Sequence, residues 1–486
     1  MKKLFSSGIA LFLMLAVSFA ATAESVTVPY DNYTYSAGGS VIVSPQAYLP
    51  EKVIYGHDLG ISDFKNATDI DCDEDGFLYI LDEEDNKIIV LNNELELDRT
   101  INIKQKLKDG TTIAVTDAQG ITVDNNRIYI CDTENNRLLV LDKTDGKYIN
   151  MITTPKSKAL EDNFLFKPIK VSVDNEGNYY IVSDGTFEGI VNMSANGEFL
   201  GFFASNEATA SAWELFWRRF STVEQRKKSI QFVPQDLSSV DKDEAGFFLV
   251  TLSSELNNTM VKRVNPGGND VIRNLSALGI TGDKAGGANQ ASSFIDISSG
   301  KYKIYACLDI TRGRIFCYNT DGYLLYTFGN ISDQKGGFAV PSAVTYLNDE
   351  RIAVLDSRLN SVTVFAPTEY AKNINKGLDL NNQLKYDEAV SQWREVLKFN
   401  QNYEFAQNMI ATSYYNSGEY EKALEYFEKA NNKEMYSITK EAIRKIWLSE
   451  NLTKIVIAVF GLVALMYVIK FIKWRKNPSE KSKKEE

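Results

Sequence analysis

The segment Tyr129-Ile130-Cys131-Asp132, followed after a short turn by Asn136-Arg137-Leu138-Leu139-Val140-Leu141, decides the fold of this chain. A clear copy is Tyr79-Ile80-Leu81-Asp82 followed by Asn86-Lys87-Ile88-Ile89-Val90-Leu91, and weaker copies bring the total to six. Each copy has short alternating apolar runs bounded by Asp, Asn and Gly, which is the chemistry of strands and turns. A period of about fifty residues with such strands is typical of a β-propeller, in which no blade is stable alone. We therefore predict an all-β, six-bladed propeller over residues 24–366.

The way in which the ring closes can also be predicted. The sixth copy stops after its third strand, at Phe365. Near the N-terminus, Lys52-Val53-Ile54-Tyr55-Gly56 resembles Leu325-Tyr326-Thr327-Phe328-Gly329, the fourth strand of the fifth copy. We expect this N-terminal strand to complete the last blade, because that arrangement leaves no open sheet edge.

The repeats resemble the NHL-repeat family of six-bladed propellers. The resemblance is carried by Asp82 with Asn86-Lys87-Ile88, and by Asp132 with Asn136-Arg137-Leu138. Related propellers include sugar-lactone hydrolases with an acidic metal site, a peptidylglycine lyase with histidines around zinc, and domains that only bind. The resemblance therefore leaves binding and catalysis open. This chain has a single histidine, His57, expected on the closing strand or the turn after it, which argues against a His-ligated catalytic metal.

Both ends of the chain have the pattern of membrane-targeting segments. Residues 1–23 combine two lysines, an apolar run and the small residues Ala21-Thr22-Ala23, and are predicted to be a signal peptide. Residues 451–473 are long and apolar enough to be a transmembrane helix. The tail at 474–486 is basic, so we expect it in the cytoplasm and the preceding domains outside. These features suit a single-pass protein of a bacterial cytoplasmic membrane.

The charge of the chain limits its partners. The net charge is −11 although both ends are basic, so the exported part is more acidic than the whole. Binding to nucleic acid requires a basic surface and is not expected. The four cysteines are too few for a disulfide scaffold, although Cys307 and Cys317, on consecutive predicted strands, are a candidate pair.

Between residues 367 and 450 the apolar period changes to that of helices. Tyr386, Ala389 and Trp393 recur 34 residues later as Tyr420, Ala423 and Phe427. This spacing resembles tetratricopeptide (TPR) repeats, and predicts two repeats followed by a capping helix at 437–450. The resemblance implies that a partner-binding groove is lined by Asn375, Asn382, Asn408, Thr412 and Tyr415. A rigid spacer that holds the propeller off the bilayer is an equal alternative.

One large insertion, at about residues 205–230, departs from the propeller pattern. Trp213, Phe216, Trp217 and Phe220 have helical spacing, and Arg218 and Arg219 begin a basic cluster. The interpretation that we favour is a helix laid over the propeller with its aromatic side chains buried. The alternatives are docking of a partner, through Trp213, Trp217, Arg218 and Arg219, and contact with acidic lipid headgroups.

Calcium is the one cofactor that the sequence suggests. Asp71, Asp73 and Asp75 alternate before Gly76, as at the start of a calcium-binding loop, and Asp82 lies twelfth. We favour a plain hairpin turn for this segment because no helices are expected to flank it. The Asp residues that end equivalent strands (Asp82, Asp132, Asp309 and Asp356) are better explained by turn capping than by catalysis.

The sequence shows no recognisable catalytic set, and it contains two predicted interaction folds on one anchor. We therefore predict a non-enzymatic, extracytoplasmic binding or scaffold protein for protein or peptide partners, accessory to a transporter or an envelope complex. The alternative is an exported propeller hydrolase of the lactonase type, which would need acidic and polar residues converging at the central channel. An inward-signalling sensor is disfavoured because the predicted cytoplasmic tail is short.

Overall fold

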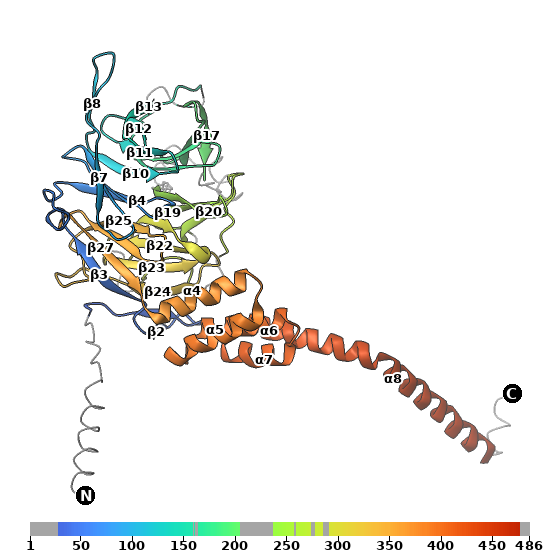
Figure 1. The fold of residues 1–486 in the computed structure, drawn as a ribbon. Coiled ribbons are helices and arrows are strands. Elements are labelled where there is room, and N and C mark those ends of the chain that lie inside the picture. The colour runs from blue at the N-terminus through green and yellow to red at the C-terminus, as the bar shows by residue number, and fades with distance from the viewer. Residues whose placement is uncertain are drawn as a thin grey trace, which may run out of the picture.

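The computed structural model describes residues 28–158, 160, 164–204, 237–256, 259–273, 278–284 and 291–476. Within these residues, six antiparallel sheets are arranged around a common centre as the blades of a propeller (Figure 1). Their first strands contact one another in a closed circuit, β4 (Ala67–Cys72), β10 (Ala118–Val123), β14 (Pro168–Val173), β18 (Leu237–Lys242), β21 (Phe294–Ser299) and β25 (Pro341–Tyr346). The six-bladed fold that the repeats predict is confirmed.

The remaining strands of each blade follow outward from the centre in chain order, except that the N-terminal strand β3 is the outermost strand of blade 6. Blades 1 to 3 continue with β5 (Leu78–Asp82), β6 (Lys87–Leu91), β7 (Leu97–Asn102); β11 (Arg127–Asp132), β12 (Arg137–Asp142), β13 (Tyr148–Thr153); and β15 (Tyr179–Ser183), β16 (Ile190–Met193), β17 (Phe199–Phe203). Blades 4 to 6 continue with β19 (Phe248–Leu256), β20 (Thr259–Val264); β22 (Ile304–Asp309), β23 (Arg314–Asn319), β24 (Leu324–Phe328); and β26 (Ile352–Asp356), β27 (Ser361–Pro367), β3 (Tyr48–Ile54). Blade 4 has three strands in the described part of the chain.

The N-terminal strand β3 closes the ring. It pairs antiparallel with β27, with Ile54 opposite Val362 and Tyr48 opposite Pro367. The first and last parts of the propeller are thereby joined in blade 6, as the sequence predicts. His57 follows on the short 3-10 helix η1 (Gly56–Leu59), where its ring lies 2.7 Å from the Asp63 carboxylate on the surface.

The repeated Asp and Asn residues hold the turns of the blades. Asn86, Asn136 and Asn360 precede the third strands of blades 1, 2 and 6, and have positive φ angles of 51°, 51° and 46°. Asn tolerates this left-handed conformation better than most residues, which explains its place in the repeat. Asp82 and Asp132 are fully buried, and each accepts a backbone N–H from the segment before the first strand of its blade. These hydrogen bonds agree with the predicted capping role.

Two hairpins decorate the propeller. β1 (Tyr33–Tyr35) and β2 (Val41–Val43) form one that lies against β24, and β8 (Gln105–Lys106) and β9 (Thr112–Ile113) form another after blade 1. The four cysteines are free. Cys307 pairs in register with Phe316, and Cys317 with Ala306, so the two cysteines point to opposite faces of blade 5. The candidate disulfide is therefore absent.

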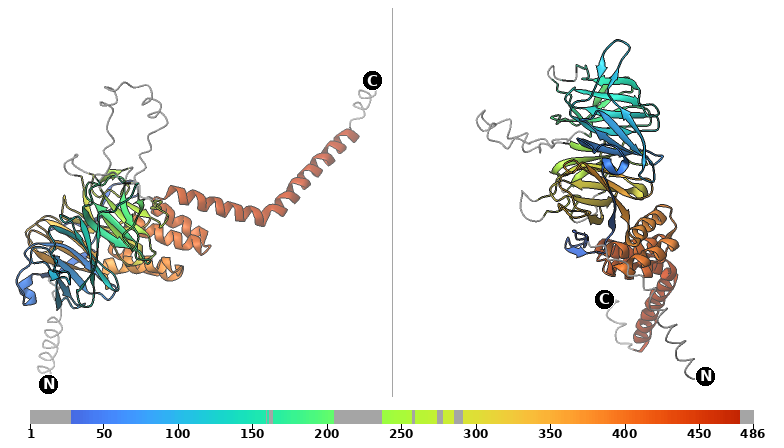
Figure 2. Two further views of the ribbon diagram at one scale, coloured as in Figure 1. Left: turned by 90° about the horizontal axis from the view of Figure 1, so that it is seen from above. Right: turned by 60° about the vertical axis from the view of Figure 1, so that its left-hand side comes forward.

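A module of helices follows β27 at one end of the propeller (Figures 1 and 2). Its four shorter helices form two successive hairpins, α4 (Glu369–Asn382), α5 (Tyr386–Phe399), α6 (Glu404–Asn416) and α7 (Tyr420–Lys429). The last helix, α8 (Lys433–Lys476), has 44 residues, leads away from the propeller and bends along its length (Figure 2). The capping helix and the apolar span that the sequence predicts as separate segments are thus one continuous helix.

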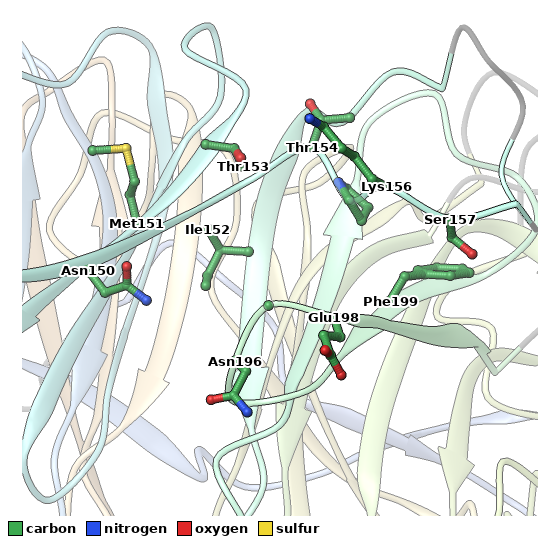
Figure 3. Close-up of a pocket in the computed structure, with 12 residues that line it drawn as sticks. Asn150, Met151, Ile152, Thr153, Thr154, Lys156, Ser157, Asn196, Glu198 and Phe199 are labelled. Carbon is green, nitrogen blue, oxygen red and sulfur yellow. The ribbon is translucent and has the colours of Figure 1, made fainter.

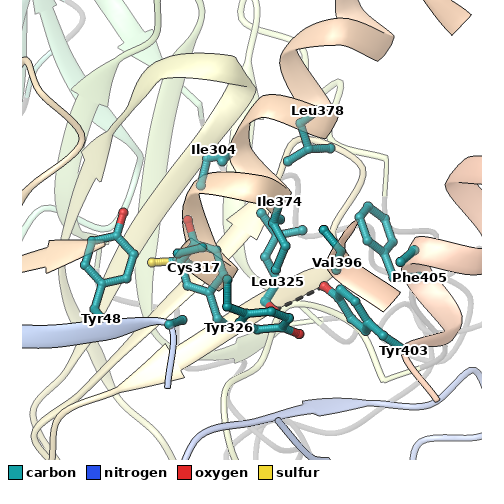
Figure 4. Packing of buried hydrophobic residues seen from close by; sticks show 14 of the residues in the cluster. Tyr48, Ile304, Cys317, Leu325, Tyr326, Ile374, Leu378, Val396, Tyr403 and Phe405 are labelled. Atoms are coloured by element: carbon teal, nitrogen blue, oxygen red, sulfur yellow. Dashed lines mark hydrogen bonds between the residues drawn. The ribbon is translucent and has the colours of Figure 1, made fainter. Parts of the chain in front are cut away.

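The helical module and the propeller share one hydrophobic core. Tyr48, Leu325 and Tyr326 of blades 5 and 6 belong to the same buried cluster as Ile374 and Phe405 of the helices (Figure 4). Burial of a large apolar side chain stabilises the folded chain by about 1.5–3 kcal/mol, so this contact fixes the module on the propeller.

Candidate functional site

The register of the six first strands places one residue from each blade at the same level of the central channel. A β-bulge precedes this position in every first strand, and each residue lies opposite an equivalent residue of the second strand. We call these six residues the first ring: Asp69, Gly120, Lys170, Ser239, Asp296 and Ala343. Because side chains alternate along a strand, the residues two positions later form a second ring on the same face. The second ring is Asp71, Thr122, Ser172, Asp241, Ser298 and Thr345.

The first ring is closed by ion pairs that cross the channel. The Lys170 ammonium of blade 3 lies 2.6 Å from the Asp69 carboxylate of blade 1 and 2.9 Å from the Asp296 carboxylate of blade 5. Asp69 is 1% exposed and Asp296 is 3% exposed, so water has almost no access to either carboxylate. Burial alone would lower the pKa of Lys170, but the Asp296 and Asp69 carboxylates outweigh it and raise that pKa above its usual range. Lys170 therefore stays protonated.

Both carboxylates of the first ring also bind the backbone of the following blade. Asp69 accepts a hydrogen bond of 2.7 Å from the Ile121 N–H, and Asp296 accepts one of 2.8 Å from the Val344 N–H. The Ser239 hydroxyl donates a further hydrogen bond of 2.7 Å to Asp296. Burial raises the pKa of Asp69 to about 6. The first ring therefore joins blades 1 to 6 at their centre.

The second ring holds two carboxylates without an ion-pair partner among the described residues. Asp71 accepts backbone N–H groups from Val123 and Cys72, and Asp241 accepts them from Ser299 and Lys242. Burial, and then the nearby Asp241 carboxylate, raise the pKa of Asp71 well above its usual range. Burial likewise raises the pKa of Asp241 to about 6. The charge of Asp296 adds to the rise at Asp241, and the Lys170 ammonium opposes it.

The sequence pattern alone does not single out Lys170, Asp241 or Asp296. The available signal was a charged residue at an alternating position of an otherwise apolar first strand, as in Ser239-Val240-Asp241 and Asp296-Ile297-Ser298. This signal does not show which face of the strand is inward. The bulge and the closure of the ring determine that face.

The three candidate calcium ligands point in different directions. Asp71 belongs to the second ring. Asp73 is buried, accepts the Phe77 N–H at 2.8 Å and lies 2.7 Å from the Lys143 ammonium, while Asp75 is exposed. Across the described ranges, no three His, Cys, Asp or Glu side chains are grouped so that they could hold a metal ion. The hydrogen bonds of Asp73 are those of a turn, and calcium binding stays a prediction.

Two of the residues expected in the helical groove contact the propeller instead. Asn375 is 2% exposed; its side-chain oxygen accepts the Tyr326 hydroxyl at 2.9 Å, and its NH2 group donates to Glu350 at 2.8 Å. Asn382 donates to the Tyr302 carbonyl at 3.2 Å. Blades 5 and 6 therefore occupy the α4 part of the expected groove.

The other expected groove residues lie on α6, and each is partly buried within the module. Asn408 accepts a hydrogen bond of 2.8 Å from Asn432, which directly precedes α8. Thr412 donates to the Asn408 carbonyl at 2.9 Å, and the Tyr415 ring packs edge-on against Tyr420 of α7. Trp213, Trp217, Arg218 and Arg219 lie outside the described residues.

A second candidate is a hollow at the rim of blades 2 and 3 (Figure 3). Its volume is about 610 Å³, and it lies between Asn150–Ser157, which include the end of β13, and the turn Asn196–Phe199. Polar side chains and the charged Lys156 and Glu198 line it together with Ile152 and Phe199. Such a lining suits a polar surface contact more than an enclosed apolar ligand.

One family description and several solved structures are similar to this chain. The family description "NHL repeat" matches residues 116–141, which include β10 and β11. A search of curated proteins gave no match. Among solved structures, a streptogramin B lyase is 12% identical, with a TM-score of 0.41, over 67% of this chain and 100% of that chain. A virginiamycin B lyase from Staphylococcus aureus is 12% identical, with a TM-score of 0.40, over 65% of this chain and 98% of that chain.

A Kuenenia stuttgartiensis hydrazine synthase is 12% identical, with a TM-score of 0.37, over 63% of this chain and 97% of that chain. Similarity at this level carries no functional argument. The six sheets and the matched repeat define the class: a six-bladed β-propeller protein with an NHL repeat. Its particular features are the C-terminal helical module and one long apolar helix.

Proposed function

We propose that this protein is a membrane-anchored, extracytoplasmic scaffold of a bacterial cytoplasmic membrane, and that its propeller presents binding surfaces to a transporter or an envelope complex. The observation that carries the proposal is the core shared by the propeller and the helical module. Since α8 continues directly from that module, the propeller and the apolar helix are held as one unit. This construction suits a protein that keeps a binding domain at a fixed place near a bilayer.

The anchor in this proposal is the second half of α8. It is the one helix in the described part of the chain that is long and apolar enough to cross a membrane. At about 1.5 Å rise per residue its 44 residues extend roughly 66 Å, about twice the thickness of a hydrocarbon core. The first half would then stand outside the membrane as a stalk. Lys473, Arg475 and Lys476 at its C-terminal end favour a cytoplasmic tail.

We assign the two helical hairpins to the TPR class. α5 and α7 begin 34 residues apart, at Tyr386 and Tyr420, and the equivalent Ala389 and Ala423 are fully buried. Small residues at these positions allow neighbouring helices to approach closely. Because Asn375 and Asn382 bind the propeller, we propose that the module chiefly couples the propeller to the anchor, and that Asn408, Thr412 and Tyr415 support this packing.

Hydrolysis by the first ring of the channel is disfavoured by the state of its two carboxylates. Asp69 and Asp296 are sealed by Lys170, and each already accepts a backbone N–H group. A general acid or base needs access to substrate, which the first ring does not offer. We therefore propose that partners contact surfaces away from the first ring, and that Trp213, Trp217, Arg218 and Arg219 take part in this binding.

In-cell crosslinking followed by purification in mild detergent and mass spectrometry tests this proposal. We expect a stoichiometric membrane complex. Replacing both Trp217 and Arg218 with Ala should reduce its recovery, whereas replacing the exposed Lys106 and Lys108 of the β8–β9 hairpin should not. Loss of folding in the Trp217/Arg218 variant would instead support a buried helix, and a protein that crosslinks to nothing would contradict the scaffold role.

A further inference from the structure

The two rings of the channel differ in one respect that suggests a ligand. In the first ring, two carboxylates from different blades are bridged by the ammonium group of Lys170. In the second ring, Asp71 and Asp241 from different blades are not bridged by any cation of the described chain. The first ring thus shows that this channel accommodates an ammonium group between two carboxylates.

Besides Asp71 and Asp241, the second ring holds a polar side chain, Ser172, without a hydrogen bond among the described residues. Ser172 is 3% exposed, and within the described residues its hydroxyl makes no hydrogen bond. Ser172 lies two residues after Lys170 on β14, so its side chain points to the same, inward face as the Lys170 side chain. The Ser172 hydroxyl is therefore free to accept a hydrogen bond from a ligand in the channel.

The second ring is open to solvent from one end only. Asp71 and Asp241 are partly exposed, whereas Asp69 and Asp296 of the first ring are buried. A ligand must therefore enter from the end of the channel at which the first strands finish and turn into the second strands. The side chains of the first ring block access from the opposite end.

The entrance at that end is strongly acidic. It is formed by the six turns between first and second strands, residues 73–77, 124–126, 174–178, 243–247, 300–303 and 347–351. Ten acidic residues lie in these turns: Asp73, Glu74, Asp75, Asp124, Asp174, Glu176, Asp243, Glu244, Asp349 and Glu350. The turns also hold the basic residues Lys301, Lys303 and Arg351, and two neighbouring cations, Lys143 and Arg263, pair with Asp73, Asp75 and Asp243. Acidic residues therefore remain in excess at this end. Such a mouth concentrates cations and excludes anions.

We propose that the second ring binds an organic cation, a primary ammonium or guanidinium group, that enters through this acidic mouth. Its N–H donors bind the Asp71 and Asp241 carboxylates from opposite sides and the Ser172 hydroxyl from blade 3. A primary ammonium has three donors, which matches these three acceptors. A metal ion fits less well because no three carboxylate, His or Cys side chains of the described chain converge there. This site is independent of the scaffold role proposed above.

Isothermal titration calorimetry on the full chain in detergent tests the proposal, with spermidine and blocked lysine (N-acetyl-lysine methylamide) as probes. We expect one saturable site in the wild type. Asp71→Asn and Asp241→Asn should each weaken binding at least tenfold, because one charge-assisted partner is lost. Ser172→Ala should weaken it a few-fold. Asp109→Asn, on the exposed β8–β9 hairpin away from the channel, should leave the affinity within twofold.

Circular dichroism and melting of each variant establish that it is folded. If spermidine binds much more tightly than blocked lysine, the ligand is a free polyamine; the reverse order indicates a side chain of a partner protein. Failure of both probes to bind, or equal binding by the Asp71, Asp241 and Asp109 variants, would overturn the proposal. Calcium binding at Asp71 and Asp241 that neither amine displaces would overturn it as well.

Discussion

The Lys170 ammonium lies 2.6 Å from the Asp69 carboxylate, although the two residues are 101 positions apart in the sequence and belong to blades 3 and 1. This ion pair crosses the centre of the propeller. It is therefore a contact between parts of the ring that share no sheet. Each blade pairs only its own strands, so such central contacts add a connection that the sheets do not supply.

The first prediction concerns this connection. Lys170→Met should destabilise the propeller by about 3–5 kcal/mol, because Asp69 and Asp296 are left buried and unpaired. Urea unfolding of the purified protein measures the loss. Lys242→Met, on a partly exposed lysine that binds Asn175, is the matched control and should cost about 0.5 kcal/mol or less. Equal urea midpoints of unfolding for the two variants would show that the central ion pairs do not stabilise the propeller.

The second prediction concerns pH. The pKa of Asp241 is about 6 in the folded chain against an ordinary value of 3.8, so the folded state holds this proton more tightly than the unfolded state. The resulting stabilisation is complete below pH 3.8 and is lost as pH rises to about 6. Asp241→Asn should therefore gain stability over the wild type across this range, by at most about 3 kcal/mol at neutral pH.

Urea unfolding at pH 4, 5, 6 and 7 measures this difference. The pKa of Asp69 is also about 6, and Asp69 remains in the variant. The free energy of unfolding of the variant should therefore still fall as pH rises, but less steeply than that of the wild type. Asp75→Asn, on an exposed carboxylate, is the control. A difference between Asp241→Asn and the wild type that does not change with pH would contradict the prediction.

The third prediction tests the closure of the ring. Deleting residues 24–60 removes β3 and leaves β27 as an open edge of blade 6. We expect the whole propeller to lose its cooperative melting transition, since blades do not fold alone. Shortening the β8–β9 hairpin between Lys106 and Thr112 removes a comparable surface loop without opening a blade and should leave the transition intact. A soluble deletion with unchanged melting would refute closure by β3.

The fourth prediction tests the docking of the helices. Asn375→Ala removes the partner of the buried Tyr326 hydroxyl and one partner of Glu350, and should destabilise the contact by about 1–3 kcal/mol. Limited proteolysis between β27 and α4, together with thermal unfolding, measures the loosening. Lys376→Ala, on the exposed side of the same helix, should change neither readout. Unchanged protease resistance in Asn375→Ala would mean that apolar packing alone holds the module.

The sequence by itself determined the number of blades, their turns and the closing strand. These features depend on local periods and turn residues: alternating apolar positions, Asp and Gly at hairpins, and Asn at left-handed positions such as Asn86 and Asn136. The helical repeat was equally readable, because the offset between Tyr386 and Tyr420 is a property of the chain alone. Local patterns of this kind can be read without knowing which residues meet in the tertiary structure.

Only the tertiary structure decided what the polar residues do. Lys170, Asp69 and Asp296 meet because bulges rotate three first strands so that these side chains face one axis, and no spacing in the sequence encodes that meeting. The TPR resemblance predicts that Asn375 faces a partner, but blade 5 covers it. The small helical module buries its apolar faces against the much larger propeller. The two rings of channel residues and the docking of the helices depend on contacts between residues far apart in the sequence. These residues meet only when the six blades close into a propeller.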